Sequence, residues 1–319
     1  MHAATVDRIP GRLVRVRIPT QMSWKPGQHV FVRFLALGVQ SLTAHPFTIC
    51  SLPHEPGKCG KRSEIILYVQ PRRGITARLA KLVDANSTSS LKVLIEGPYG
   101  GLGPGSLGGF DTSVVVSGGS GAGFSLAVAE DAMRQHRYVA RARCCQTDST
   151  SDVEAGRQSR PKLHIIYATR EVEVAEWYEN AIKDLVETYF PWTDISASIH
   201  ITTSEAHPVD KSKPSSPKDK DSSDPEKAGP APNISALNTG TPTFINPYRC
   251  RPNVPETITR FAASDSGSVA RTSRSIGITA CGPASLLHDV RNAAAEAQRG
   301  VISGKSGLVE VYLHSERFS

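Results

Sequence analysis

The chain has 319 residues, of which 39% are hydrophobic, so two domains with buried cores are the expected organisation. Its formal net charge of +7 is modest for this length, and because no basic run is interleaved with aromatic residues, we expect no nucleic-acid binding. The 6 cysteines form no Cys-x-x-Cys pair and no zinc spacing, which indicates reduced thiols and predicts no metal site. No apolar stretch approaches the roughly 18 residues that span a bilayer, so we expect a soluble chain.

Residues 1 to about 107 are predicted to form a small closed β-barrel domain. The stretch from Arg12 to Ile18 alternates apolar and basic residues, as a half-exposed strand does. Other short β-rich segments follow at close spacing, separated by turns and one short helix. These segments are residues 29–34, 45–51, 64–70 and 91–96, with the helix at 76–83. Short strands at this spacing favour a barrel.

A glycine-rich turn then joins a β-branched run, Val114 to Val116, to a helix predicted from Ser125 to about His136. The residues of the turn are Gly118, Gly119, Ser120, Gly121 and Gly123, with one residue between the last two glycines. Strand, glycine turn and helix N-terminus together predict a site for an anion such as a phosphate. The spacing is not Gly-x-Gly-x-x-Gly, so the usual Rossmann fingerprint is absent. A flexible glycine loop is the alternative.

From residue 108 onwards, strands and helices alternate, which predicts a parallel sheet in a second domain, 108–319. The further predicted strands are 163–168, 195–201, 275–280 and 309–314, and the further helices are 173–190 and 283–300. Two polar insertions interrupt this pattern. Residues 146–160 are predicted to be a loop. Residues 205 to about 274 are predicted to be a disordered insertion, because the first part, to about 240, is almost devoid of large apolar side chains.

The most informative short motif is His45-Pro46-Phe47-Thr48. An extended segment that presents an imidazole, a ring and a hydroxyl suits a flat heteroaromatic ligand with polar edges. A barrel strand with a core phenylalanine and a turn-forming proline is the alternative.

A possible phosphate site follows about 25 residues later, where Arg72, Arg73, Gly74 and Thr76 stand at the start of the short helix. Guanidinium groups together with a helix N-terminus suit a pyrophosphate. Two solvated surface charges are the alternative, since this is the commoner fate of an arginine.

Together with the turn Gly97-Pro-Tyr99-Gly100, these motifs resemble the ferredoxin–NADP reductase-like superfamily, and within it the fungal ferric-chelate reductases and NADPH oxidases. The resemblance implies a six-stranded antiparallel FAD-binding barrel followed by a parallel-sheet NADPH-binding domain. It implies that His45, Pro46, Phe47 and Thr48 face the flavin, with the Thr48 hydroxyl near N5. It also implies that Arg73, Gly74 and Thr76 hold the FAD pyrophosphate, and that Gly118 to Gly123 hold the NADPH phosphates.

The preference for NADPH over NADH is predicted from charge. Thr169 and Arg170 follow a predicted strand where the adenosine ribose would lie, and a hydroxyl and a cation favour a 2′-phosphate. The alternative for Arg170 is a salt bridge with Glu171 or Glu173. Arg251 begins an Arg-Pro-Asn segment like one that lies nearby in the family, although Cys250 stands where the family has glycine.

Cys281-Gly282-Pro283 lies between a predicted strand and a predicted helix, where the resemblance places the nicotinamide. We interpret Cys281 as a residue that packs and orients, not as a nucleophile, because no histidine is placed to activate it. A buried structural thiol is the alternative. Phe318 is the candidate for the aromatic residue that relatives place over the flavin.

The expected function is therefore that of the cytosolic dehydrogenase half of a ferric-chelate reductase, at the cytosolic face of the plasma membrane. Its expected partners are NADPH, an Fe(III) chelate as terminal acceptor, and a membrane domain carrying haem, which this sequence lacks; we expect the chain to be a fragment. Three alternatives stay open: an NADPH oxidase that reduces oxygen, a non-catalytic nucleotide-binding remnant, and a free-standing flavin reductase.

Overall fold

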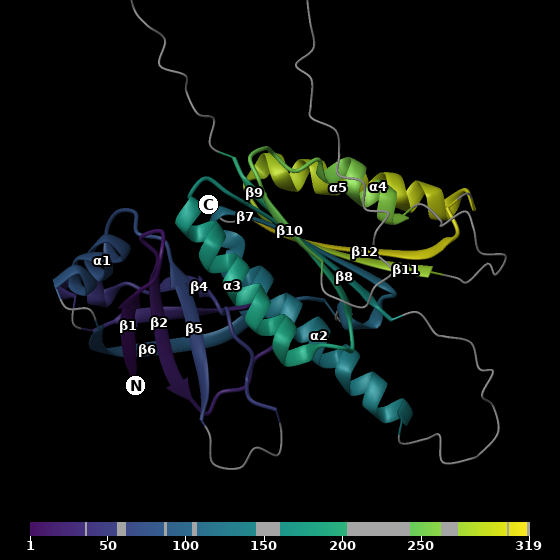
Figure 1. Ribbon diagram of the computed structural model, residues 1–319. Helices are drawn as coiled ribbons and strands as arrows, with labels where there is room; N and C mark the ends of the chain where they lie inside the picture. The colour runs from purple at the N-terminus through teal and green to yellow at the C-terminus, as the bar shows by residue number, and fades with distance from the viewer. Residues whose placement is uncertain are drawn as a thin grey trace, which may run out of the picture.

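The computed structural model describes residues 1–35, 37–55, 62–85, 88–103, 107–144, 160–202, 243–262, 274–304 and 306–317. Within these residues, two six-stranded sheets lie next to each other, the first antiparallel and the second parallel (Figure 1). The fold class predicted from the sequence is therefore confirmed. No helix among the described residues is both long enough and apolar enough to cross a membrane.

The antiparallel sheet has the order β4-β3-β6-β1-β2-β5. Its strands are β1 (His2–Arg8), β2 (Val14–Thr20), β3 (Gln28–Phe34), β4 (His45–Thr48), β5 (Ser63–Val69) and β6 (Thr88–Gly100), and its helix is α1 (Ile75–Ala85). Alternate residues of β2, such as Val14, Val16 and Ile18, are buried, as the apolar–basic alternation predicts. The two ends of the sheet meet where the Cys50 N–H donates to the Ile66 carbonyl, 2.8 Å away.

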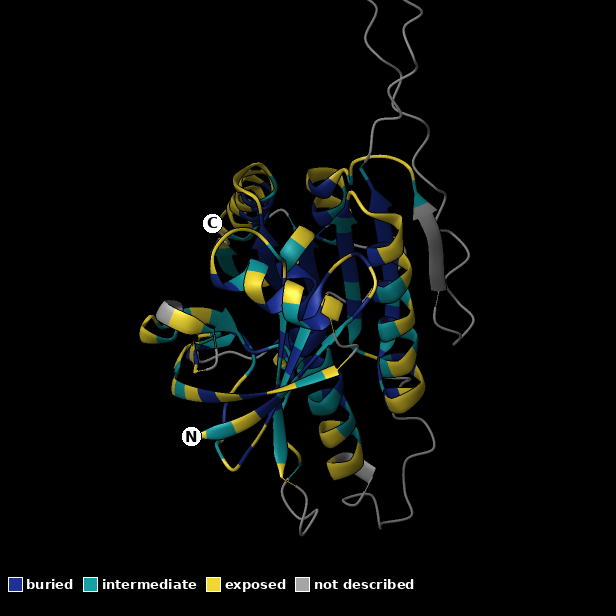
Figure 2. Cartoon of the chain, turned by 90° about the vertical axis from the view of Figure 1, so that its left-hand side faces the viewer, coloured by how far each residue is buried: buried dark blue, intermediate teal, exposed yellow. Residues whose placement is uncertain are grey.

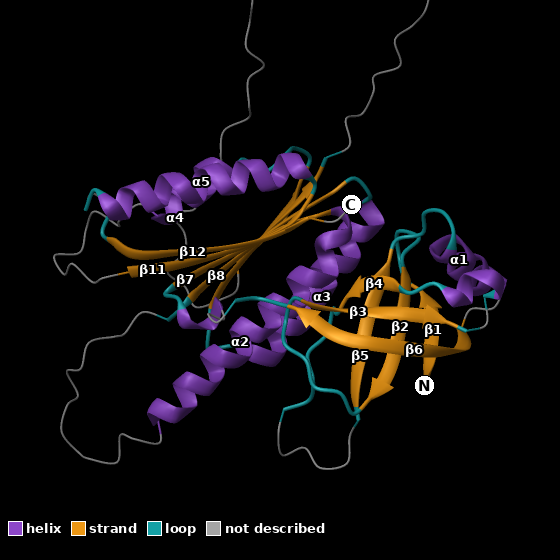
Figure 3. Cartoon of the chain, turned by 180° about the vertical axis from the view of Figure 1, so that it is seen from behind, coloured by secondary structure: helices purple, strands orange, loops and turns teal. Residues whose placement is uncertain are grey.

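The parallel sheet has the order β10-β9-β8-β7-β11-β12. Its strands are β7 (Thr112–Gly118), β8 (Lys162–Thr169), β9 (Asp194–Ile201), β10 (Thr243–Tyr248), β11 (Arg274–Gly282) and β12 (Leu308–Arg317). Helices α2 (Ala122–Cys144) and α3 (Val172–Tyr189) cover one face, and α4 (Val254–Ala262) and α5 (Ala284–Ile302) cover the other (Figure 3). All seven residues of β7 are buried, because helices pack on both faces of this central strand (Figure 2).

Three apolar cores hold these layers together. One fills the barrel, and the other two lie on either side of the parallel sheet. The barrel rests against α2 and α3, where the Tyr68 and Trp177 rings meet edge to face with centroids 4.9 Å apart. Gly11, in the turn between β1 and β2, donates its N–H to Glu173 Oε2 at 3.1 Å.

One expectation was wrong for part of the 205–274 stretch. Residues 203–242 and 263–273 lie outside the described residues, but β10 and α4 lie between them. Strand β10 pairs with β9 in parallel, and α4 buries Val254, Ile258 and Ala262 one turn apart against the sheet. The expectation of disorder extended too far because the polar composition up to about residue 240 was carried over to a segment that regains apolar periodicity. Most of the 146–160 stretch also lies outside the described residues.

Candidate functional site

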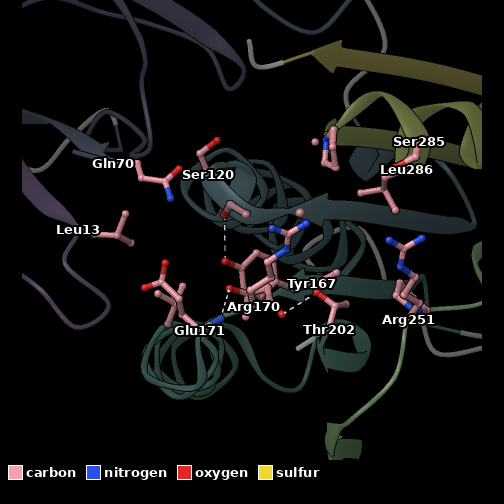
Figure 4. Close-up of a pocket in the computed structure, with 18 of the residues that line it drawn as sticks. Leu13, Gln70, Ser120, Tyr167, Arg170, Glu171, Thr202, Arg251, Ser285 and Leu286 are labelled. Carbon is pink, nitrogen blue, oxygen red and sulfur yellow. Dashed lines mark hydrogen bonds between the residues drawn. The ribbon is translucent and has the colours of Figure 1, made fainter. Parts of the chain in front are cut away.

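A cavity of about 480 Å³ lies at the carboxyl ends of the parallel strands, beside the barrel (Figure 4). It is the edge at which open parallel sheets bind ligands. The predicted site residues that line it are Gly118, Gly119, Ser120, Thr169, Arg170, Arg251, Gly282 and Pro283. The barrel contributes Leu13, Gln70 and Arg72. The cavity therefore joins residues from both halves of the chain.

The glycine turn forms one wall of this cavity. Gly119 has a φ of +57°, and a Cβ there would meet no atom within 4 Å, so its backbone is open to a ligand. Its carbonyl accepts a hydrogen bond from the Tyr167 hydroxyl at 3.0 Å. Helix α2 begins within the glycine-rich stretch, at Ala122 rather than at the predicted Ser125, so the positive end of its dipole lies beside the cavity.

The end of β11 lies very close to this turn. A Cβ on Gly121 would lie 2.6 Å from the Cys281 carbonyl oxygen, and one on Gly282 would lie 3.3 Å from the Gly118 nitrogen. Only glycine permits backbones to approach this closely. The two segments that the sequence assigned to the dinucleotide phosphates and to the nicotinamide are thus packed together.

Besides Arg72 of the barrel, two arginines line the cavity, Arg170 after β8 and Arg251 before α4 (Figure 4). Among the described residues, Arg170 forms no ion pair with Glu171 or Glu173, and Glu173 instead accepts the Gly11 N–H. Thr202, at the end of β9, is tied to this corner because its N–H donates to the Thr169 carbonyl at 2.8 Å. The corner thus combines hydroxyl groups with exposed guanidinium groups, which suits an anion.

On the barrel side, β4 carries His45 to Thr48. Phe47 packs edge-on against Phe34 of the barrel core, with centroids 6.1 Å apart, so Pro46 and Thr48 lie on the opposite side of the strand. His45 Nε2 lies 2.8 Å from the Thr43 hydroxyl oxygen. None of these four residues lines the cavity at the parallel sheet.

The predicted pyrophosphate segment forms the start of α1. Gly74 has a φ of +69°, and the Thr76 hydroxyl accepts the Arg72 N–H at 2.9 Å. Arg73 is exposed, and the neighbouring Arg72 lines the cavity. Arg73, Gly74 and Thr76 lie outside that cavity.

Residues 97–100 form the end of β6 and pair with β3, so the strand continues where the sequence predicted a turn. Tyr99 is 42% exposed and donates its hydroxyl to Glu96 Oε1 at 3.0 Å, which raises the pKa of the tyrosine. Its ring centroid lies 6.0 Å from those of His29 and Phe31. Gly97 has a φ of +126°, and neither residue lines the cavity.

Cys281 is fully buried at the end of β11, and burial raises the pKa of its thiol. Burial also raises the pKa of the Cys50 thiol to about 12, and Cys50 lies two residues after Thr48. A Cβ on Gly123 would lie 2.4 Å from Cys50 Sγ, in the same turn that contacts Cys281. Cys50 of the barrel and Cys281 of the parallel sheet therefore both pack against the glycine turn, where the two domains meet. Phe318 lies outside the described residues.

Several cavity residues were missed by the sequence analysis. Thr202 could have been found, because it directly follows β9, Thr169 is the last residue of β8, and neighbouring parallel strands end at the same edge. Ser285 and Asp289 lie in the first turns of α5 and follow from the position of Pro283. Leu13 and Gln70 gave no signal, because they reach the cavity only through the packing of the barrel against the sheet.

Comparisons with known proteins agree with this architecture. The sequence model of the family described as "Ferric reductase NAD binding domain" matches residues 110–295, and one described as "FAD-binding domain" matches residues 1–102. The Saccharomyces cerevisiae protein "Ferric/cupric reductase transmembrane component 2" is 27% identical over 281 residues, 85% of this chain and 33% of that protein. The Aspergillus oryzae protein "Probable cell surface ferric reductase kap2" is 26% identical over 212 residues, 65% of this chain and 25% of that protein. The chain thus spans a quarter to a third of the length of these relatives.

Solved structures show the same fold. Ferredoxin-NADP+ reductase from Plasmodium falciparum superposes with a TM-score of 0.51 at 10% identity, over 99% of this chain and 95% of that one. A ferredoxin NADP+ reductase from Neisseria gonorrhoeae, solved with FAD and NADP, gives 0.50 at 13% identity, over 99% and 97%. The predicted cofactor classes, FAD and a nicotinamide dinucleotide, are confirmed by the family models. Since the first family model covers more than half of its residues, the chain belongs to the ferric reductase family defined by that NAD-binding domain.

Proposed function

We propose that this chain is the dehydrogenase part of a ferric-chelate reductase, which takes electrons from NADPH through FAD and delivers them towards haem and Fe(III). The observation that carries the proposal is the single cavity in which the glycine turn, Arg170 and Arg251 meet barrel residues. An oxidoreductase of this kind needs its two cofactor sites to open onto each other, because the transferred hydride must not cross water.

The residues of the cavity fit a dinucleotide. Gly121 and Gly282 let the glycine turn pack closely against the end of β11, and Gly119, where a Cβ would meet nothing within 4 Å, is open towards the cavity. Arg170 and Arg251 supply positive charge at one end. A pyrophosphate with a further phosphate on the ribose is the anion that suits a glycine turn, a helix N-terminus and separate guanidinium groups.

When bound, the nicotinamide supplies a hydride and the flavin releases electrons one at a time. The chain's own residues bind and orient. The glycine turn holds the phosphates, and Arg170 and Arg251 bind the ribose phosphate. Cys281 stays a neutral thiol because burial raises its pKa, so its role is packing beside Gly282 and Pro283. Thr48 offers its hydroxyl from the face of β4 opposite Phe47.

In the complete protein, we propose that the electrons pass to a membrane domain carrying haem and then to an Fe(III) chelate, with this part on the cytosolic face of the plasma membrane. The names of the relatives, which include "transmembrane component", support this arrangement. The terminal acceptor and the membrane partner are therefore proposals drawn from the family.

The direct test is to express the chain, add FAD and follow the flavin absorbance under nitrogen after addition of NADPH. Bleaching, followed by recovery when an Fe(III) chelate is added, is the expected result. A chain that takes up FAD but is not bleached by NADPH would contradict the proposal. NADH in place of NADPH is the matched control for the coenzyme, and it should bleach the flavin more slowly at equal concentration.

A further inference from the structure

The segment that continues from β4 lies along helix α2. Cys50 packs against Gly123 in the first turn of the helix. Pro53 and Glu55 contact Arg134 and Arg137 further along it. Gly123 and Arg134 are about three helical turns apart, and the long Arg134 side chain reaches Pro53, so the two contacts use separate parts of α2. Segment 50–55 is thus attached to α2 at two distant places.

Arg134 is the centre of the second attachment. Its guanidinium donates to the Pro53 carbonyl at 2.7 Å, to the Tyr189 hydroxyl at 2.9 Å and to Glu130 Oε1 at 2.6 Å. These partners lie in the segment after β4, at the end of α3 and in α2 itself. The side chain is 22% exposed, so its charge is largely withdrawn from water and its bonds are correspondingly strong.

Arg137 supports the same attachment from one turn further along α2. Its guanidinium forms an ion pair with Glu55 and lies over the Tyr189 ring, 4.8 Å from the centroid. Tyr189 also donates its hydroxyl to Glu130 at 3.1 Å. Because Tyr189 and Glu130 remain bonded to each other, removal of the Arg134 side chain leaves neither group without a partner.

We propose that Arg134 is a positioning residue for hydride transfer, since it fixes the segment carrying Thr48 against the helix that begins at the glycine turn. Hydrogen bonds from Cys50, Ser51 and His54 bind this segment to β5 and its start, so the segment moves together with the barrel. The contact at Pro53, added to the one at Gly123, therefore fixes this edge of the barrel against α2. The inference rests on the proposed function, because it assumes that Thr48 faces the flavin and that the glycine turn holds NADPH. A displacement of about 1 Å between reacting groups costs on the order of 100-fold in rate.

The test compares Arg134→Ala with the wild-type chain loaded with FAD, in anaerobic stopped-flow mixing with NADPH. We expect flavin reduction at saturating NADPH to slow by about 10-fold to 100-fold, with the dissociation constants for FAD and NADPH changed by less than about twofold. The long-wavelength absorbance of stacked nicotinamide and flavin should weaken as well. Arg134→Lys keeps the charge, but an ammonium group cannot reproduce the planar geometry in which the guanidinium donates to its three partners. This variant should therefore give an intermediate rate.

Arg141→Ala is the matched control, because Arg141 lies seven residues further along α2 and is exposed. It should leave the rate unchanged. An Arg134→Ala chain that reduces its flavin at the wild-type rate would overturn the inference, and so would a loss of rate explained entirely by weaker NADPH binding. If the wild-type chain is not bleached at all, the proposed function fails, and the role of Arg134 in hydride transfer fails with it.

Discussion

Gly123 and Cys50 are in contact across the junction of the two halves of the chain. A Cβ on Gly123 would lie 2.4 Å from Cys50 Sγ and 2.5 Å from Tyr68 Cδ2, which is closer than real side chains approach. The packing of the barrel against α2 therefore restricts this position to glycine. Gly123, the last glycine of the turn, is the residue that makes this contact with Cys50 and Tyr68.

The first prediction is that Gly123→Ala destabilises the chain. The added methyl group must displace Cys50 and Tyr68, and overpacking of this kind costs about 1–3 kcal/mol. The gain in helix propensity, at most about 1 kcal/mol, opposes this cost but is smaller near a helix end. The free energy of unfolding in urea measures the net effect. Gly109→Ala is the control, because a Cβ there meets nothing within 4 Å.

A second variant tests the cause of the destabilisation. In the Gly123→Ala chain, Cys50→Ala removes Sγ, the nearest of the three obstructing atoms, so it should recover part of the lost stability. The double variant should then lose less stability than the sum of the losses in the two single variants. If Gly123→Ala and Gly109→Ala have the same stability, or if Cys50→Ala adds to the loss without recovery, the contact does not limit this position.

Much of the fold follows from local patterns in the sequence. The alternation in β2 and the buried run in β7 each predicted their strands, because burial on one face or on two leaves different periodicities. The cavity residues after β7, β8 and β11 also followed from their places at strand ends. These predictions depend only on a residue and its neighbours in the sequence, and not on contacts between distant segments.

Contacts between distant parts of the chain could not be predicted in the same way. The place of Arg134 against Pro53, or of Leu13 at the cavity, depends on how the barrel packs on α2 and α3. No pattern within either segment encodes this packing. Helix α2 also runs on to Cys144, past the predicted end near His136, because the arginines that follow contain no helix breaker and remain compatible with a helix.

The second prediction concerns the choice of coenzyme. Arg170→Ala should weaken NADPH binding by about 10-fold to 100-fold, since a hydrogen bond between charged groups contributes about 1.5–3 kcal/mol. NADH has no 2′-phosphate, so its affinity should change by less than about twofold. Dissociation constants for both coenzymes, measured by titration of the FAD-loaded chain, decide this. Equal losses for NADPH and NADH would show that Arg170 does not bind the ribose phosphate.

The third prediction concerns acid stability. His136 is 3% exposed and its Nδ1 lies 3.0 Å from the Thr193 hydroxyl oxygen, and burial lowers its pKa to about 4. In the unfolded chain its pKa is about 6.5, so between pH 6.5 and pH 4 the unfolded state binds the extra proton. Folding stability is therefore present above pH 6.5 and is lost as the pH falls. The loss from pH 7 to pH 5 is about 2 kcal/mol from this residue.

His136→Asn tests this assignment, because an amide can keep the bond to Thr193 but does not titrate. Its free energy of unfolding should fall by about 2 kcal/mol less than that of the wild-type chain between pH 7 and pH 5. His164, whose pKa burial lowers to about 3, titrates in both chains and cancels in the comparison. Parallel pH profiles for the two chains would contradict the assignment of this acid sensitivity to His136.

The fourth prediction concerns the reactivity of the cysteines. Cys250 is exposed, whereas burial raises the pKa of the Cys281 thiol and raises that of Cys50 to about 12. Since the thiolate is the form that alkylates, iodoacetamide at pH 8 should modify Cys250 in the native chain well before Cys50 or Cys281. Mass spectrometry of the digested chain gives the order, and the same treatment in urea should modify all three. Early modification of native Cys281 would show an accessible thiolate, and its assignment as a neutral packing residue beside Gly282 would then be wrong.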